Sequence, residues 1–282
     1  MALPDGFDLQ QFVQSVLAED LGAGGDVTSK ATISKGARFA AEMNARQAIV
    51  VAGLEIAAAF FRALDADAKI ELLVNDGERV GRGTTLMRLT GNARAMLSAE
   101  RSALNTLQHL SGIATLTRQY VDAIGTAKAV LLDTRKTVPG LRVLEKFAAR
   151  MGGAQNHRLR LDDGILIKDN HVAVCGGVAE AVRRAKEAST GLNVQVEVDR
   201  IDQIEPALSA GADRLLLDNM DPSMLREAVA LVAGRVPLEA SGGVTLETIR
   251  FLAETGVDFI SVGRITQSAP AVDIGLDYSL NG

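Results

Sequence analysis

The 282-residue sequence has one cysteine, three histidines, two tyrosines and no tryptophan. A single cysteine excludes a disulfide framework and an all-cysteine metal site. Three histidines without the HExxH spacing argue against a zinc protease. Aromatic residues make up only 4% of the chain, so the core must consist mainly of Leu, Val, Ile and Ala. That composition is typical of buried parallel strands.

The sequence also lacks a long apolar run and an excess of positive charge. Its longest apolar stretch, residues 48–61, is interrupted by Glu55 and is too short to span a bilayer. The net charge of −5 argues against a surface for nucleic acid or anionic membranes. The first residues contain no basic segment that leads into an apolar run. We therefore expect a soluble cytoplasmic protein without nucleic-acid or membrane partners.

The pattern of the first 120 residues differs from that of the rest. Apolar residues at helical spacing predict three helices, at 7–18, around 53–64 and at 95–120. The last of these is expected to break near Gly112 and to bridge two domains. Strand-like stretches predict three strands, at 39–45, 70–74 and 85–89.

After about residue 125, short apolar runs alternate with helical segments. Each run ends in polar residues; the runs lie at 129–132, 165–167, 194–196, 215–217, 237–238 and 259–262. Six strands that alternate with helices predict repeated βα units on a parallel sheet. A doubly wound open sheet is the alternative, but no GxGxxG follows a first strand. We favour a β/α barrel, in which the carboxyl ends of the strands share one face.

Basic residues are concentrated at residues 133–160, where seven basic and two acidic residues give +5 and leave −10 for the rest of the chain. Arg135 and Lys136 end a buried strand and precede a Pro-Gly turn, and His157 and Arg158 lie in a Gly/Asn-rich loop. These four are predicted to bind a small polyanion. The segment 141–151 is predicted to be a helix whose charged residues form a solvated face: Arg142, Glu145, Lys146 and Arg150.

Three further strand ends carry charged groups, namely Lys168, Glu197 and Asp218. A lysine at a barrel strand end can form a Schiff base or bind a phosphate as a point charge, and the neighbouring carboxylates favour the second role. The two acids lie on consecutive strands, and such a pair suits Mg²⁺ or sugar hydroxyls. A structural salt-bridge network is the alternative. His171 is interpreted as a structural histidine.

Glycines follow the last two strands, in Ser241-Gly242-Gly243 and Gly263-Arg264. Turns of this kind let backbone N–H groups approach a phosphate near a helix N-terminus. Anion-binding turns, two carboxylates and a basic cluster on one rim fit a phosphorylated sugar together with a second anionic substrate.

These motifs resemble the quinolinate phosphoribosyltransferase family, and the resemblance runs nearly end to end. It is carried most specifically by Asp133-Thr134-Arg135-Lys136-Thr137, Asn156-His157-Arg158, Ile167-Lys168-Asp169-Asn170-His171, Leu217-Asp218-Asn219-Met220 and Glu239-Ala240-Ser241-Gly242-Gly243. The implied fold is α/β: an N-terminal α/β sandwich at 1–115, with a C-terminal tail at 270–282 that packs back on it, and an incomplete six-stranded β/α barrel at 116–269.

The resemblance implies a pentosyltransferase of NAD biosynthesis. The reaction would convert quinolinate and phosphoribosyl pyrophosphate, with Mg²⁺ as cofactor, into nicotinate mononucleotide, pyrophosphate and CO2. A phosphoribosyltransferase of the same fold with another acceptor is one alternative, and a Schiff-base lyase that uses Lys168 is a weaker one. The implied assembly is a homodimer in which Arg101 completes the neighbouring site, with a hexamer also open.

The resemblance also implies roles for individual residues. The quinolinate carboxylates and the phosphates would be met by Arg135, His157, Arg158 and Lys168. Lys136 would lie near the pyrophosphate, and Glu197 and Asp218 would meet ribose hydroxyls and Mg²⁺. The implied catalytic residues are Lys136, Lys168, Glu197 and Asp218. The 5′-phosphate would lie against Ser241, Gly242, Gly243 and Gly263, and the remaining substrate-binding residues would be Thr134 and Arg264. The chain departs from the family pattern at Arg160, Arg264 and Gln267.

Overall fold

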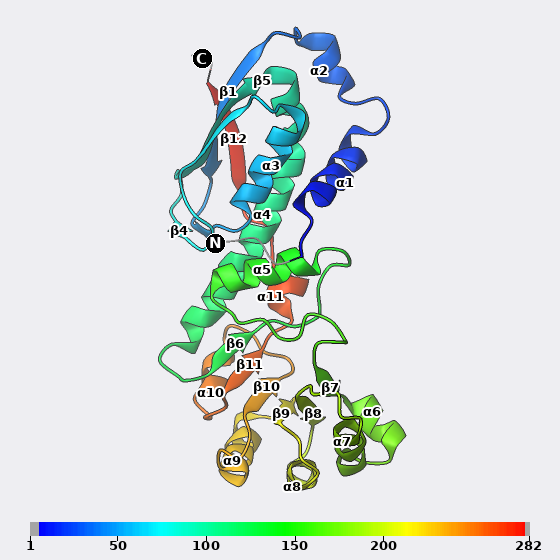
Figure 1. Ribbon diagram of the computed structural model, residues 1–282. Coiled ribbons are helices and arrows are strands. Elements are labelled where there is room, and N and C mark those ends of the chain that lie inside the picture. Colours follow the sequence, from blue (N-terminus) through cyan, green and yellow to red (C-terminus); the bar gives the residue numbers. More distant parts are fainter. Residues whose placement is uncertain (1–5, 280–282) are drawn as a thin grey trace. The chain divides into compact units, whose positions relative to one another are not determined.

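The computed structural model describes residues 6–279 of the chain (Figure 1). These residues divide into two compact units. The first contains the chain up to Thr117, Val143–Gly153 and the segment from Ser268 onward; the second contains Arg118–Arg142 and Ala154–Gln267. Residues 143–153 thus pack with the first unit, although they lie inside the sequence range expected for the barrel.

The first unit is built on a four-stranded antiparallel sheet in the order β12-β1-β5-β3. Strand β12 pairs with β1, so the end of the chain completes a sheet that is formed near its beginning. Figure 1 shows α3 and α4 on one side of this sheet. The strands are β1 (Arg38–Ala45), β3 (Lys69–Leu72), β5 (Thr85–Asn92) and β12 (Ile274–Ser279), with a separate antiparallel pair β2 (Ile49–Val50) and β4 (Arg79–Val80).

Local sequence explains these elements. Along β1, every second side chain is buried, at Ala41, Met43 and Ala45, because the side chains of a strand alternate between its two faces. The carboxylate of Asp8 accepts a hydrogen bond of 2.8 Å from the backbone N–H of Gln11 and so caps α1. The helices that lie wholly or largely in this unit are α1 (Leu9–Leu21), α2 (Val27–Thr32), α3 (Leu54–Leu64), α4 (Ala93–Ile124) and α5 (Arg142–Gly152).

Helix α4 is continuous over 32 residues, so the predicted break near Gly112 is wrong. A Cβ atom on Gly112 would lie 2.2 Å from the carbonyl oxygen of Pro270. The glycine therefore serves close packing of the C-terminal segment against the helix and does not end the helix. A glycine inside a helical pattern often has such a packing reason.

Helix α5 corrects a second expectation, the solvated face at residues 141–151. Glu145 and Lys146 are buried, at 0% and 2% exposure, between the buried residues Leu144 and Phe147. Oε1 of Glu145 lies 2.9 Å from Nε2 of His109 on α4. Because α5 is covered on most of its circumference, only Arg150 near its end is fully exposed. The charged residues at helical spacing in this segment therefore do not form a solvent-exposed face.

The second unit contains six parallel strands in the order β6-β11-β10-β9-β8-β7. The first two strands of the series, β6 and β7, are the edges of this sheet, so the β/α barrel is open, as the resemblance to the family implied. Gln155 occupies part of the free edge of β6 through a parallel bridge to Leu132. The strands are β6 (Val130–Leu132), β7 (Ile165–Ile167), β8 (Val194–Val198), β9 (Arg214–Asp218), β10 (Leu238–Ser241) and β11 (Phe259–Ser261).

Helices connect the successive strands and lie outside the sheet (Figure 1). Asp221 caps one of them, since its carboxylate accepts from the N–H groups of Ser223 and Met224 at 2.8 and 2.9 Å. The helices are α6 (Asp169–Cys175), α7 (Val178–Glu187), η1 (Ile201–Gln203), α8 (Ile204–Ser209), α9 (Pro222–Val232), α10 (Ile249–Ala253) and α11 (Arg264–Gln267).

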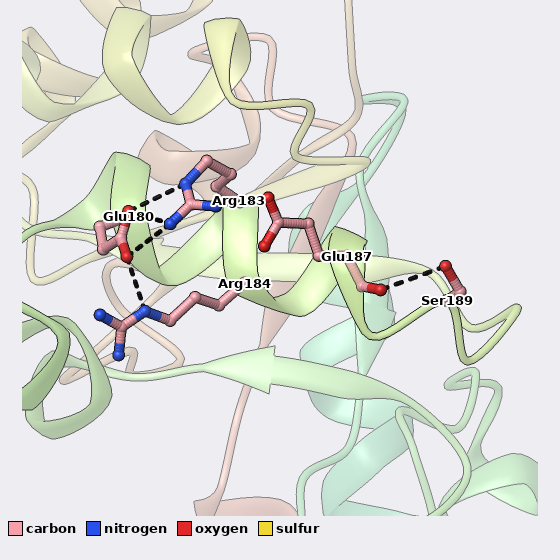
Figure 2. A network of polar contacts seen from close by, with 5 residues as sticks. All are labelled: Glu180, Arg183, Arg184, Glu187 and Ser189. Carbon is pink, nitrogen blue, oxygen red and sulfur yellow. Dashed lines mark hydrogen bonds and ion pairs between the residues drawn. The ribbon is translucent and has the colours of Figure 1, made fainter.

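Helix α7 shows what a solvated charged face looks like in this molecule. Arg183 and Arg184 both bind the carboxylate of Glu180, and Ser189 donates to the carbonyl of Glu187 (Figure 2). Arg183 also pairs with Glu187. These exposed pairs add little to the stability of the helix, because water and salt screen them. Among the residues that the structure describes, no helix is both long enough and apolar enough to cross a membrane.

Candidate functional site

A cavity of about 600 Å³ opens at the carboxyl ends of the barrel strands. All of its lining residues belong to the second unit. It gathers thirteen of the fourteen residues predicted from the sequence: Thr134, Arg135, Lys136, His157, Arg158, Lys168, Glu197, Asp218, Ser241, Gly242, Gly243, Gly263 and Arg264. The fourteenth, Arg101, is exposed on α4 in the first unit.

The loop after β6 brings two cations to this cavity. The hydroxyl of Thr134 accepts a hydrogen bond of 3.0 Å from the backbone N–H of Lys136, and Thr266 donates to the carbonyl of Lys136 at 2.7 Å. A Cβ atom on Gly263 would lie 2.7 Å from Cδ of Lys136. Gly263 thus leaves room for the lysine side chain to lie across the turn, a second role beside the backbone access expected from the sequence.

Asp133, at the end of β6, anchors the second basic loop. Its buried carboxylate accepts from the backbone N–H of His157 at 2.8 Å and from the side-chain amide of Asn156. Arg158 donates to the carbonyl of Gly164 at 2.8 Å. Burial, together with the charge of nearby Arg135, lowers the pKa of Arg158, although an arginine stays charged at neutral pH. The guanidinium groups of Arg135 and Arg158 therefore lie close enough to affect each other electrostatically.

A polar network fills the barrel interior beneath His157. Its Nε2 atom lies 3.1 Å from Oε1 of Gln195 and 3.5 Å from Oε2 of Glu239. Gln195 donates to Glu239 at 2.8 Å, and Arg214 forms an ion pair with Glu239 at 2.7 Å. Burial alone would raise the pKa of Glu239, but the hydrogen bond and charge of His157 and the charge of Arg214 outweigh it and lower that pKa. Glu239 is thus ionised in the core.

Glu197 and Asp218 lie near the carboxyl ends of the neighbouring strands β8 and β9 and add negative charge to the site. Burial raises the pKa of both carboxyl groups, and the charge of Asp218 raises that of Glu197 further. Nζ of Lys168 lies 3.7 Å from Oε2 of Glu197 and lowers both pKa values only in part. A carboxylate pair held in this way attracts a cation or hydroxyl donors.

Lys168 has the environment of an anion-binding lysine. About half of its side chain is exposed, and its nearest charged partner is Glu197. A lysine that forms Schiff bases is activated by desolvation or by another cation, and Lys168 has neither arrangement with Glu197 beside it. Its backbone N–H donates to Nδ1 of His171 at 3.0 Å and begins α6, which fits the structural role expected for His171.

Asn219 supports Asp218 from an unusual backbone conformation. Its φ of +55° lies in the left-handed region, which Asn adopts more readily than most residues. From there its amide donates to Oδ2 of Asp218 at 2.6 Å. A Cβ atom on Gly242 would lie 2.1 Å from Oδ1 of Asn219, so the first glycine of the turn after β10 is needed for this contact.

The donor set fits a magnesium ion that is shared with a substrate. Within residues 6–279, no group of three or more His, Cys, Asp and Glu side chains could hold a metal ion by itself. Mg²⁺ usually binds one or two protein carboxylates and takes its other oxygens from water and substrate phosphates. Glu197 and Asp218, whose negative charge Lys168 offsets only in part, meet that requirement.

Sequence reasoning missed two residues that line the cavity, Asn219 and Glu239, and three that lie outside its lining, Arg142, Gln195 and Arg214. The period of two along barrel strands could have found three of them, because residues i and i+2 face the same side. Gln195 precedes Glu197 by two positions, Glu239 precedes Ser241, and Arg214 starts the series that ends at Asp218. Of the three departures noted above, Arg264 and Gln267 line the cavity, whereas Arg160 pairs with Asp162 on the surface.

Comparisons with known proteins cover nearly the whole chain. The family models "Quinolinate phosphoribosyl transferase, N-terminal domain" and "C-terminal domain" match residues 26–111 and 113–277. A mitochondrial quinolinate phosphoribosyltransferase [decarboxylating] of Nicotiana glauca is 41% identical over 96% of this chain and 82% of its own length. A probable nicotinate-nucleotide pyrophosphorylase [carboxylating] of Bacillus subtilis is 40% identical over 97% of this chain and 94% of its own. The solved nicotinate-nucleotide pyrophosphorylase of Francisella tularensis superposes with a TM-score of 0.92 at 39% identity, over 96% of each chain.

Proposed function

This chain belongs to the quinolinate phosphoribosyltransferase family, and we propose that the cavity of its second unit carries out the family's reaction. The enzyme transfers the phosphoribosyl group of phosphoribosyl pyrophosphate to quinolinate and releases pyrophosphate and CO2. The product is nicotinate mononucleotide, a precursor of NAD. The names "decarboxylating" and "carboxylating" of the relatives describe this one reaction in its two directions.

The observation that carries the proposal is that one cavity brings together a basic set of residues and a pair of carboxylates. Arg135, His157 and Arg158 come from two loops beside β6 and β7, whereas Glu197 and Asp218 end β8 and β9. A dianionic pyridine suits the basic residues, since guanidinium groups bind carboxylates with two parallel hydrogen bonds. A sugar with hydroxyl groups and a phosphate-bound cation suits the carboxylate pair.

Bond formation requires no base from the protein. The pyridine nitrogen of quinolinate has a free lone pair, which forms the new bond to C1′ of the ribose. The bond from C1′ to the pyrophosphate oxygen breaks, and its electron pair leaves with pyrophosphate. Glu197 and Asp218 stabilise the positive charge that develops at C1′. The groups that bind quinolinate hold its nitrogen in line with that carbon, which lowers the entropic part of the activation free energy.

Pyrophosphate needs positive charge as it departs. Lys136 and Lys168 are the lysines of the cavity and are proposed to meet the phosphate oxygens. Mg²⁺ on Glu197 and Asp218, bound directly or through water, would supply further positive charge to the leaving group. Ser241, Gly242, Gly243 and Gly263 are proposed to hold the 5′-phosphate, with Thr134 and Arg264 at its margin.

Decarboxylation follows from the charge on the alkylated ring. The bond between C2 and its carboxylate breaks, CO2 leaves, and the electron pair stays on C2, where the adjacent positive nitrogen stabilises it. A proton from water then completes nicotinate mononucleotide. Cations around this carboxylate orient it, but a tighter hold on the ground state than on the transition state would slow its loss.

We further propose that the enzyme acts as a homodimer, or as a hexamer built from three such dimers, in which Arg101 completes the neighbouring site. Arg101 is exposed on α4, and a third guanidinium would match the second carboxylate of quinolinate. A cytoplasmic location is part of the proposal. It is supported by the single cysteine of the chain, because proteins of oxidising compartments commonly carry disulfides.

The direct test mixes purified protein with quinolinate, phosphoribosyl pyrophosphate and Mg²⁺ and follows nicotinate mononucleotide. A parallel reaction with nicotinate in place of quinolinate tests the alternative acceptor. Product from quinolinate and none from nicotinate supports the proposal. Product from nicotinate alone would assign another acceptor, and no product from either would reject the proposed function. A borohydride-trapped adduct on Lys168 would favour the lyase.

A further inference from the structure

Two loops carry the cations of the site. The first basic loop, residues 134–140, follows β6 and contains Arg135 and Lys136; the second basic loop, residues 156–164, precedes β7 and contains His157 and Arg158. Burial and, after it, the charge of Arg135 lower the pKa of Arg158, as expected where two cations lie close enough to repel each other. An anionic substrate that binds both guanidinium groups would offset this repulsion.

Arg142 connects these two loops. Its Nε atom donates to the hydroxyl of Thr137 in the first basic loop at 3.0 Å, and its Nη1 atom donates to the carbonyl of Leu159 in the second at 3.4 Å. Both acceptors are uncharged, and the residue is half-buried. The sequence suggested a solvated helix face for Arg142, but α5 begins at this residue and directs it between the loops.

We propose that Arg142 is a positioning residue that holds the two basic loops at a fixed separation, so that Arg135 and Arg158 are ready for one dianionic substrate. The proposal rests on the proposed function, because it concerns the same cavity and the same substrate. Arg142 itself is not among the residues that line the cavity. It acts through Thr137 and Leu159.

The contacts continue from Arg142 to the residues that face the cavity. The hydroxyl of Thr137 lies 3.5 Å from the carbonyl of Arg135, and its backbone N–H donates to the same carbonyl at 3.0 Å. Leu159 is held from both sides, since its N–H donates to Asp163 at 2.6 Å while its carbonyl accepts from Arg142. Arg158 precedes Leu159, so its backbone cannot shift without breaking one of these bonds.

The chemistry of the side chain explains why an arginine stands here. A guanidinium offers several N–H donors in a rigid plane and can reach two acceptors at once. A lysine ammonium at the same place would bind one acceptor well and leave the other loop free. Because Arg142 bonds to a hydroxyl and a backbone carbonyl, the link between the loops contains no carboxylate, which would occupy the cations that the substrate needs.

The test compares Arg142→Ala and Arg142→Lys with Thr137→Val, which removes the hydroxyl acceptor at nearly constant volume. Quinolinate affinity is measured by calorimetry, separately from turnover. We expect Arg142→Ala and Thr137→Val each to weaken quinolinate binding about tenfold, and the double variant to be no worse than either. The KM for phosphoribosyl pyrophosphate should stay within about twofold, and Arg142→Lys should resemble Arg142→Ala. The control is Arg150→Ala, an exposed arginine of the same helix, which should bind like the wild type.

Hydrogen exchange of the substrate-free protein gives a readout that does not depend on the reaction. In Arg142→Ala and Thr137→Val, amides of residues 134–140 and 156–164 should exchange faster, while those of the exposed helix α7 should not change. Wild-type exchange in both loops, additive effects on quinolinate affinity, or equal losses for both substrates would overturn the positioning role. If the wild type makes no nicotinate mononucleotide but the loops loosen as described, the proposed function fails while the tether stands.

Discussion

The side-chain amide of Asn219 donates a 2.6 Å hydrogen bond to the carboxylate of Asp218 from a residue with φ of +55°. Non-glycine residues rarely hold such a conformation unless their surroundings impose it. Here the backbone N–H of Asn219 donates to the carbonyl of Ser241 at 2.9 Å, and its side chain packs on Gly242. The turn after β10 and the acid at the end of β9 are therefore one structural unit.

Asn219→Gly separates the backbone role of Asn219 from its side-chain role. Glycine keeps the left-handed conformation at no cost, so thermal stability should stay near that of the wild type. Loss of the amide frees Asp218 and should raise the KM for phosphoribosyl pyrophosphate about tenfold. Asn219→Ala should show the same kinetic defect and lose about 1–2 kcal/mol of stability as well. Wild-type kinetics in Asn219→Gly would show that Asp218 does not depend on this bond.

Gly263→Ala tests the path of the Lys136 side chain. The new Cβ would lie 2.7 Å from Cδ of Lys136, and a flexible side chain will move before the backbone does. We expect little change in the melting temperature and a clear rise in the KM for phosphoribosyl pyrophosphate. Gly81→Ala is the matched control, because no atom lies within 4 Å of its added Cβ. Equal kinetics in the two variants would remove Lys136 from the pyrophosphate site.

The acid limb of the pH profile reports on Glu197 and Asp218. Burial raises the pKa of both groups, and both act in the ionised form. Activity should therefore begin to fall, as the pH is lowered, at higher pH than ordinary carboxyl groups would require. The measurement is kcat/KM for phosphoribosyl pyrophosphate from neutral to acidic pH. A profile flat down to the ordinary range of carboxyl groups would contradict the assignment.

Glu197→Gln should lose activity and gain stability. A carboxyl group whose pKa is raised on folding stabilises the folded state in its protonated form, and that contribution is lost as the pH rises through the raised pKa. The neutral amide removes this loss. The melting temperature of the variant should therefore exceed that of the wild type at pH 8 and approach it in acid. A lower melting temperature at both pH values would show that the ionised Glu197 stabilises the substrate-free fold.

Sharing of the site between subunits is tested by mixing two inactive variants, Arg101→Ala and Lys168→Ala. In a mixed dimer with shared sites, one site carries both substitutions and the other carries neither. Random reassembly should then restore about a quarter of wild-type activity. Mixing without reassembly is the control. If reassembled dimers stay inactive, Arg101 and Lys168 do not serve the same site from different subunits.

Much of the second unit could be predicted because buried parallel strands have a simple sequence pattern. Each run from β6 to β11 is a short apolar stretch followed by the polar residues that its end presents to the cavity. Since all carboxyl ends share one face, the sequence alone predicts that residues as distant as Thr134 and Gly263 lie at one site. β12 could not be found in this way, because its pairing with β1 joins residues more than 200 positions apart.

The buried charged residues of the barrel interior and of α5 could not be predicted in this way. Glu239 and Lys146 are charged yet buried, and composition offers no reason to place either in a core. Their burial is set by partners elsewhere in the chain, such as Arg214 for Glu239. For the same reason Arg142 and Arg150 look alike in sequence, but one bridges two loops and the other is exposed.

The central claim is that this cavity joins quinolinate to phosphoribose and then removes one carboxyl group. Quinolinate labelled with carbon-13 in the carboxyl group on C2, incubated with the protein, phosphoribosyl pyrophosphate and Mg²⁺, tests both halves at once. The account predicts one labelled CO2 for each nicotinate mononucleotide formed, and none when phosphoribosyl pyrophosphate is left out. Labelled carbon retained in the product, or no product at all, would contradict it.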